Sequence, residues 1–545
     1  MNLNSQSLNL SIGIFAELVT ALIFPRNFNT IFYYAPNATG DCHMEKVLEN
    51  GIPVLVWHSR SIVHLQSFIS EELIVMACLQ ALQWRSELQG LAQSLNFLRQ
   101  AKILIEMDTS HDKDLANSIL TYCLQQDMIN ANIIFSDFAE NRIVYIYEAF
   151  PSFAMKKQEF VANTTWLYPN KMLDLKGYGL RTLPDLSEPN TILYHDANGQ
   201  PRLLGYVWDM VKEYARKRNA RLKLIFKPVE GKTLTHIQLM DLARDRSLDI
   251  AASVQPMTLR YQDRTSQYAY PVHCSSWCTM IPMEQGIQVR DLYAWTVPVK
   301  TMIFLGFIVL IHQLLHDRWL RLRRLQAIGW LVLTALLSLN FKGRIVGLFV
   351  VPPMDSPIDS FQAMANSKVR IFGIRAEYNS YDFDMRTKFS TVFRLSDSPS
   401  ELIRLRNSLN NSYAYTVTHT KWQLYAEQQA HSSRPLFRYS TDLCYYEMAP
   451  FALVIPENSP HRAPLHSFSL AVVESGLFDH WVSKSFYYMV KAGRLRMEDL
   501  FSERQAHSIS LNDLIYVLQT YLVGMASSVV LFLIEIGASW ALVSL

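Results

Sequence analysis

Long apolar runs alternate with sequence of mixed polarity along this chain. The residues from Leu514 to Ile534 carry no charge, and two more apolar runs, Tyr293–Leu315 and Ala327–Val351, lie back to back near the middle. A helix of about 20 apolar residues spans a bilayer, so the pattern predicts three membrane passes, at 292–316, 327–351 and 513–534. Long soluble stretches precede the pair and separate it from the last run.

The link between the first two apolar runs sets the expected orientation. Short basic links stay in the cytoplasm. Residues 317–326 therefore lie inside, which places residues 1–291 and 352–512 outside the cell and a tail at 535–545 inside. The basic residues of the link are Arg318, Arg321, Arg323 and Arg324.

Two apolar segments contain charges. Glu17 interrupts Ile12–Phe24, which predicts either a weak signal peptide or a sequence that starts downstream of one. Lys342 and Arg344 interrupt the second long run. Charged side chains are costly against lipid, so either they face a cavity or partner helices, or the helix ends near Asn340.

Residues 1–165 alternate strand-like and helix-like stretches, which predicts an N-terminal α/β domain. Short β-rich runs and longer stretches with helical spacing follow one another in this region. The predicted strands are Pro53–Trp57, Lys102–Glu106, Asn132–Phe135 and Arg142–Tyr147, and the predicted helices are Leu79–Gln100 and Asp112–Asp127.

The same alternation resumes on both sides of the two central apolar runs. Neither residues 166–291 nor residues 352–512 form a complete sheet pattern alone, so we predict one α/β binding domain that a membrane hairpin interrupts. Ser398 is a candidate helix N-cap. The predicted helices are 205–219 and 237–246, with a third from Ser398, and the predicted strands are 221–227, 248–253 and 449–455.

Composition excludes several classes of protein. The 545 residues suit two or three domains, and 51 basic against 48 acidic residues leave a net charge of +3, so charge gives no reason to expect nucleic acid. A mean hydropathy of +0.04 is too low for a polytopic transporter. Six cysteines are too few for a disulfide scaffold, although Cys42 and Cys78 could pair. We find no nucleophile elbow and no metal-ligand spacing, and so expect neither an enzyme nor a cofactor.

Three glycosylation sequons lie outside the apolar runs. They begin at Asn37, Asn163 and Asn410, and are compatible with an exterior location for the soluble regions. Cys274 and Cys278 lack a second pair of ligands at metal spacing. A disulfide to another exterior cysteine, or simple burial, is the better interpretation of this pair.

The order of several short motifs around the three apolar runs resembles the ionotropic receptors of insects, the divergent taste-type branch of the ionotropic glutamate receptor family. Residues 205–211 (GYVWDMV) are similar to the family's entry into a helix of the first ligand lobe. Residues 248–252 (LDIAA) are similar to the strand that precedes its ligand-binding arginine, and residues 458–460 and 474–477 to the end of the second lobe. Residues 511–535 are similar to its last helix.

This resemblance implies a bilobed, periplasmic-binding-protein-like ligand domain that closes on a small molecule and opens a cation channel in the plasma membrane, in a hetero-oligomer with co-receptor subunits. Arg260 is the nearest counterpart of the arginine that grips the ligand carboxylate, and Arg264 competes for that role. Thr418 stands where the family's second-lobe acid would be, so glutamate is not the expected ligand. The resemblance implies Arg260, Thr416 and Thr418 as candidate contacts for a small-molecule taste cue.

The chain departs from the family at the pore. A re-entrant pore loop needs about 10 helical residues to descend through half the bilayer and about 5 extended residues to return. Residues 317–326 cannot supply it, and four arginines oppose entry into lipid. Either an exon is missing from this sequence, or the product is a non-conducting, membrane-tethered binding or assembly subunit.

Overall fold

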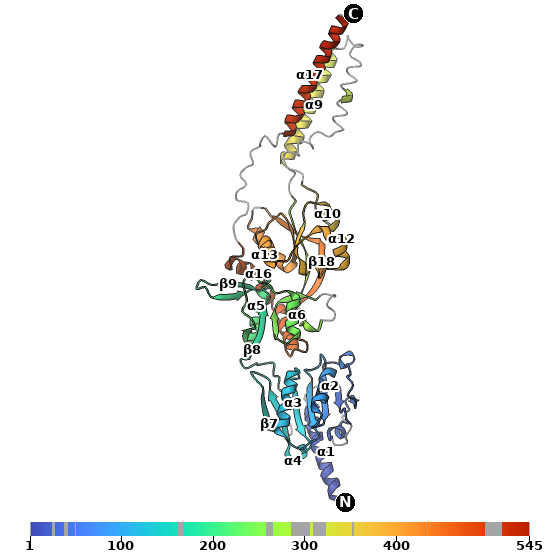
Figure 1. The fold of residues 1–545 in the computed structure, drawn as a ribbon, viewed down its shortest axis with the longest axis vertical. Coiled ribbons are helices and arrows are strands. Elements are labelled where there is room, and N and C mark those ends of the chain that lie inside the picture. Colours follow the sequence, from blue (N-terminus) through green and yellow to red (C-terminus); the bar gives the residue numbers. More distant parts are fainter. Residues whose placement is uncertain are drawn as a thin grey trace. The chain divides into compact units, whose positions relative to one another are not determined.

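The computed structural model describes most of the chain in two compact units. The first comprises Met1–Met280, Arg370–Gln429 and Tyr439–Met497, and the second comprises Ile281–Val369, Ala430–Arg438 and Glu498–Leu545. The described residues are 2–23, 28–37, 42–48, 51–161, 167–257, 265–284, 306–308, 323–350, 354–432, 434–495 and 515–543. The fold is mixed α/β with several sheets (Figure 1).

The N-terminal α/β domain is built on a seven-stranded sheet in the order β2-β1-β3-β4-β5-β6-β7. Strands β1 to β5 pair in parallel, and β6 and β7 add an antiparallel edge. The strands are β1 Thr30–Tyr34, β2 Val54–Trp57, β3 Leu73–Leu79, β4 Lys102–Met107, β5 Ala131–Phe135, β6 Ile143–Glu148 and β7 Ala154–Glu159. All seven residues of β3 are buried, as a parallel strand covered on both faces requires.

Helices cover both faces of this sheet. Side chains of β3 alternate between two apolar clusters: Val75 packs with helices α2 and α3, whereas Ile74 packs with α1 and α4. The Asp112 carboxylate caps α3 by accepting hydrogen bonds from two backbone amides. The helices are α1 Asn2–Ile23, α2 Trp84–Ser94, α3 Lys113–Gln125 and α4 Phe138–Asn141, with short 3-10 turns η1 Met44–Val47 and η2 Leu65–Ser67. Phe15 of α1 is fully buried.

We call residues 167–284 the first segment. Its core is a three-stranded parallel sheet in the order β11-β8-β12, with a β9–β10 hairpin beside it. The apolar face of α5 buries Val207, Met210 and Val211, as its helical spacing predicts. The elements are β8 Gly179–Pro184, β9 Ile192–His195, β10 Pro201–Leu204, α5 Tyr206–Lys217, β11 Arg221–Leu224, α6 His236–Arg244, β12 Ile250–Ala252, β13 Val254–Pro256 and β14 His273–Pro282.

We call residues 370–429 the second segment and residues 439–495 the third. Together with β13 and β14 they form a six-stranded sheet in the order β13-β18-β14-β17-β15-β16. The elements are β15 Ile371–Ile374, α11 Arg375–Tyr378, α12 Phe383–Lys388, η6 Ser390–Val392, β16 Phe393–Ser396, α13 Pro399–Asn407, β17 Ala414–Thr418, α14 His419–Ala430, β18 Phe437–Leu453, α15 Arg462–Glu474 and α16 Leu477–Lys491. The chain leaves this sheet after β14 and rejoins it at β15, so residues 283–370 interrupt a single sheet.

Among the described residues of this interruption, one helix is long and apolar enough to cross a membrane. It is α9, Arg323–Val350, and the qualifying stretch is Ala327–Leu348. Within the described part of the chain, α17 (Ile515–Val543) contains a shorter apolar stretch, Tyr521–Ile534. The short helix α10, Phe361–Asn366, also belongs to the second unit.

Several sequence predictions need correction. The predicted helix Leu79–Gln100 is wrong at both ends, because Leu79 closes the unpredicted strand β3 and the helix α2 spans only Trp84–Ser94. The interpretation that a helix ends near Asn340 is wrong, because α9 runs unbroken to Val350. The predicted strand 449–455 overlaps only the last part of β18, which begins at Phe437 and ends at Leu453.

Most of the predicted first membrane run, 292–316, lies outside the described residues; residues 306–308 are helical. In the predicted link 317–326, residues 317–322 are outside them and α9 begins at Arg323.

Candidate functional site

The candidate site is a pocket between the first and second segments. It measures about 990 Å³ out to its open mouth. Its walls come from the turn after β8, the start of α6, β13 and β14 on one side, and from α11, α13 and α14 on the other. The polar and charged residues among those that line it are Ser187, Thr233, Thr235, His236, Gln255, Glu377, Ser380, Arg406 and Lys421.

Two cationic side chains of the second segment line the pocket. The Lys421 ammonium donates a hydrogen bond to the Ser187 hydroxyl at 2.8 Å. Arg406, which is 6% exposed, donates to the Tyr425 hydroxyl at 2.8 Å and to the Thr416 carbonyl at 3.1 Å. Burial, with a smaller contribution from the neighbouring Arg406, lowers the pKa of Lys421 to about 8 against the opposing effect of nearby carboxylates.

A buried carboxylate fixes the turn that carries Ser187. Asp185 accepts hydrogen bonds from the Thr191 hydroxyl at 2.6 Å, the Ser253 hydroxyl at 2.8 Å and the Asn190 amide at 3.1 Å. Asp185 also accepts a hydrogen bond from the Ser187 backbone N–H at 3.0 Å. Because Asp185 is fully buried and multiply bonded, the backbone of the turn at Ser187 is held in place before any ligand enters.

A second polar bridge joins the two segments beside the first. The Asn407 amide donates to one carboxylate oxygen of Glu188 at 3.0 Å, and Arg494 of the third segment donates to the other at 2.8 Å. Arg494 also pairs with Glu230 at 2.6 Å. The bonds Ser187–Lys421 and Glu188–Asn407 therefore close the pocket on adjacent residues of one turn.

Glu377 is the acidic group of the pocket. It lies on α11, and the Thr416 hydroxyl donates to its carboxylate at 3.4 Å. Burial raises the pKa of Glu377, while Lys421 and Arg406 act in the opposite direction. The pocket thus combines two cationic groups with one carboxyl group.

One wall of the pocket, beside the charged groups, is an aromatic ring with further aromatic rings packed behind it. Trp277 of β14 lines the pocket, and its ring lies 5.8 Å from Tyr381 and 6.1 Å from Tyr446. Tyr381 stacks on Tyr445 at 4.2 Å. The next residue, Cys278, forms a disulfide with Cys444 of β18, which links the first and third segments covalently under this wall.

The residues predicted to contact the ligand lie either outside the described residues or behind the lining of the pocket. Arg260 and its competitor Arg264 lie outside the described residues. Thr416 is 2% exposed on β17 and supports Glu377 and Arg406 from behind. The Thr418 hydroxyl accepts a hydrogen bond from the Lys421 backbone N–H at 3.3 Å at the start of α14, so it supports the helix that carries Lys421.

Sequence reasoning missed Lys421, Arg406 and Glu377. Arg406 carried a usable signal, because it lies one helical turn after buried Leu402 and so falls on the apolar face of a predicted helix. Lys421 and Glu377 lie in short helices without a distinctive pattern. Only the fold brings them together.

The cysteine prediction is confirmed at one site: Cys42 and Cys78 form a disulfide. Cys274 is free and exposed, so of the CSSWC pair only Cys278 is bridged. Among the sequons, Asn163 lies outside the described residues. The Asn37 amide donates to Gln80 at 3.0 Å and to Glu87, whereas the Asn410 side-chain oxygen accepts from the Ser412 backbone N–H at 2.9 Å.

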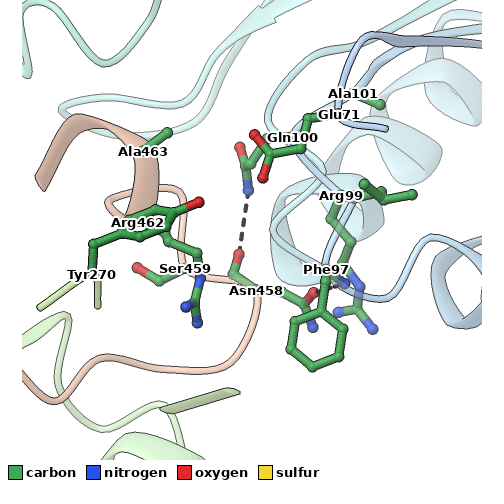
Figure 2. A pocket seen from close by; sticks show the side chains of 11 residues that line it. Glu71, Phe97, Arg99, Gln100, Ala101, Tyr270, Asn458, Ser459, Arg462 and Ala463 are labelled. Atoms are coloured by element: carbon green, nitrogen blue, oxygen red, sulfur yellow. Dashed lines mark hydrogen bonds between the residues drawn. The ribbon is translucent and has the colours of Figure 1, made fainter. Parts of the chain in front are cut away.

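A second cavity lies where the N-terminal domain meets the third segment (Figure 2). It measures about 680 Å³ out to its mouth. The Asn458 side chain accepts from the Phe97 backbone N–H at 2.6 Å, and Gln100 donates to the Asn458 carbonyl at 3.3 Å. Arg462 donates to the Tyr268 carbonyl at 2.5 Å. These polar groups are engaged with the protein itself, so this cavity is a weaker candidate for a ligand.

Comparison with known proteins does not assign the chain to a family. No protein-family model matches the chain, and a search of curated proteins finds no similar sequence. Among the described residues, no group of three or more His, Cys, Asp or Glu side chains is arranged to hold a metal ion. The chemistry of the pocket must therefore be interpreted from its own side chains.

Proposed function

We propose that this chain is a membrane-anchored chemosensory receptor subunit that binds a small-molecule cue in the pocket between the first and second segments. The single observation that carries the proposal is the interruption of one six-stranded sheet, between β14 and β15, by a sequence that contains the apolar helix α9. In such a chain, a ligand that brings the segments together would pull on the ends of the membrane insertion.

The pocket chemistry supports this proposal. The first and second segments share the β14–β17 strand pair, and beside the pocket they also meet through two polar bridges, Ser187–Lys421 and Glu188–Asn407. A ligand that replaces or reinforces these bonds changes the free energy of closure, and only such differential binding can drive a conformational switch. The domain would then be a bilobed clamshell, with the ionotropic receptors as the implied family and a gustatory cue other than glutamate as the ligand.

The proposed cellular setting is the plasma membrane, with the soluble regions outside and a co-receptor subunit that supplies the pore. The alternative is a non-conducting binding or assembly subunit, which the short 317–326 link favours. Reading the transcript across residues 318–326 distinguishes the two: an additional exon there would restore a pore loop, and a continuous junction would support the tethered subunit.

Topology is the most direct test. Single cysteines at exposed positions of the second segment, such as Lys388, are labelled from outside intact cells with a membrane-impermeant maleimide in a background lacking free Cys274. Labelling before permeabilisation supports the proposal. If labelling requires permeabilisation while a cysteine in the N-terminal domain reacts from outside, the two segments lie on opposite sides of the membrane and the receptor proposal is refuted.

Ligand-evoked current, with a co-receptor present, tests function. Lys421→Ala should reduce the response to an active cue at least tenfold, and the matched variant Lys388→Ala, on exposed α12, should leave it unchanged. Equal responses from the two variants would remove Lys421 from the recognition site.

A further inference from the structure

We propose that the pocket recognises aldehydes or ketones by reversible imine formation on Lys421. This inference specifies the ligand class of the site in the proposed function and rests on it. Three observations carry it: the position of the amine in the lining of the pocket, the absence of an ion pair to it among the described residues, and the groups around it.

The amine is accessible to a small ligand and lacks a strong ionic partner. Lys421 lines the pocket, and its one hydrogen bond in the described structure is to the neutral Ser187 hydroxyl. Among the described residues, no carboxylate lies close enough to Lys421 for an ion pair. A carboxylate partner would hold the amine in its charged form, which is not nucleophilic.

Burial and the adjacent Arg406 favour the neutral amine, and they outweigh the opposing effect of Asp185, Glu377 and Glu188 on the pKa of Lys421. Arg406 lines the same pocket, and a fixed guanidinium beside a lysine disfavours a second positive charge. Lysines are activated as nucleophiles in this way, by desolvation or by an adjacent cation. With a pKa of about 8, Lys421 is about one-quarter neutral at pH 7.5, compared with about 0.1% for an ordinary lysine.

The reaction needs no oxidant or reductant. The neutral amine nitrogen attacks the carbonyl carbon, a C–N bond forms and the carbonyl oxygen takes a proton. The resulting carbinolamine loses that oxygen as water. The net change from the lysine ammonium and an aldehyde is a protonated imine and one water molecule, with charge conserved. Glu377 lines the same pocket, beyond ion-pair distance of Lys421, and is the carboxyl group that we propose takes part in the proton transfers.

Imine formation would also alter the bridge between segments. The Lys421 nitrogen keeps at most one N–H in the imine, and the carbon chain of the ligand occupies space between Ser187 and the Trp277 wall. The ligand would thus be joined covalently to the second segment while contacting the first. This provides a direct link from recognition to closure.

The test uses the purified full chain in detergent, with butanal and sodium cyanoborohydride, which reduces an imine to a stable amine. Peptide mapping by mass spectrometry compares three lysines. Lys421 should be alkylated at least tenfold more than exposed Lys388, and the yield should rise with pH around 8. Lys171 is the matched control, because burial also lowers its pKa to about 8 but its amine is hydrogen-bonded to the Ile129 carbonyl at 2.6 Å in the N-terminal domain.

Each outcome decides between the alternatives. Selective labelling of Lys421, reduced in Trp277→Ala and lost in Lys421→Arg, supports the proposal. Labelling of Lys421 no greater than that of Lys388, or equal to that of Lys171, overturns it. A ligand-evoked current that survives in Lys421→Arg refutes the imine as the recognition step and leaves the receptor function intact. Selective labelling without any evoked current supports the imine chemistry and counts against the receptor function.

Discussion

Buried His461 should make the first unit sensitive to acid. It lies just before α15, is 3% exposed, and shares a hydrogen bond of 3.0 Å with the Tyr214 hydroxyl of α5. Burial lowers the pKa of His461 to about 4, and Arg218 and Arg181 contribute in the same direction against nearby Asp249. The folded protein therefore holds this imidazole neutral over a range in which the unfolded chain protonates it near pH 6.5.

The direction in which stability changes with pH follows from the difference in proton binding between the folded and the unfolded chain. Between about pH 6.5 and 4 the unfolded chain binds the proton and the folded chain does not, so stability falls as pH falls. For pKa values of 6.5 and about 4, the loss attributable to His461 is about 0.2 kcal/mol at pH 7 and about 2 kcal/mol at pH 5. His273, whose pKa burial also lowers to about 4, adds a loss of the same sign.

His461→Phe should remove this part of the pH dependence. We expect the loss of unfolding free energy between pH 7 and pH 5 to shrink by about 2 kcal/mol relative to the wild type. The assay is urea unfolding of the chain in detergent, followed by tryptophan fluorescence at both pH values. Tyr214→Phe removes the same hydrogen bond but keeps the imidazole, so it should retain the full pH dependence. An unchanged pH dependence in His461→Phe would show that the histidine is not held neutral.

Three further predictions test the scaffold. Gly205→Ala should destabilise the first unit by about 3 kcal/mol or more in the same unfolding assay, because φ is +118° and a Cβ would lie 2.3 Å from the Asn190 carbonyl oxygen. The control Gly199→Ala, at φ +71° with open space around it, should cost only about 1 kcal/mol, and equal costs for the two variants would contradict the clash. Replacing Cys278 and Cys444 together by serine should lower the free energy of unfolding by about 2–4 kcal/mol, whereas Cys274→Ser should change it by no more than about 0.5 kcal/mol. A double variant as stable as the wild type would argue against the disulfide. Loss of a glycan is measured as a shift in gel mobility, and Asn410→Gln should give a larger shift than Asn37→Gln because the Asn37 amide is hydrogen-bonded to Gln80 and Glu87. The reverse order would count against this local structure.

The sequence predicted the helices and strands whose pattern is local. The apolar spacing of α5 and the long apolar run within α9 both correspond to observed helices, because one-sided spacing and the length of an apolar run are visible in the local sequence. Strand β3 was missed, since its continuously apolar sequence, LIVMACL, has no alternation that distinguishes it from a buried helix. The length of β18 was missed because its first part carries mixed, half-exposed residues.

The site was less predictable than the fold. Thr416 and Thr418 were chosen by resemblance, and the structure places them behind the groups that line the pocket. Lys421 shares its pocket with Arg406, fifteen positions earlier in sequence, and is bonded to Ser187, more than two hundred positions earlier. Such juxtapositions arise from the order of strands in a sheet. A single sequence does not encode that order in any local pattern.

Strand β18 limits how the pocket can open. Its last residues pair with β13, at Leu453 opposite Val254, while its body lies next to β14 in the same sheet, where Cys444 is tied to Cys278. A continuous strand resists stretching but tolerates twisting. Under the proposed function, release of a ligand would therefore proceed by a small rotation about this strand, because a wide separation of the segments would first require several of its backbone hydrogen bonds to break.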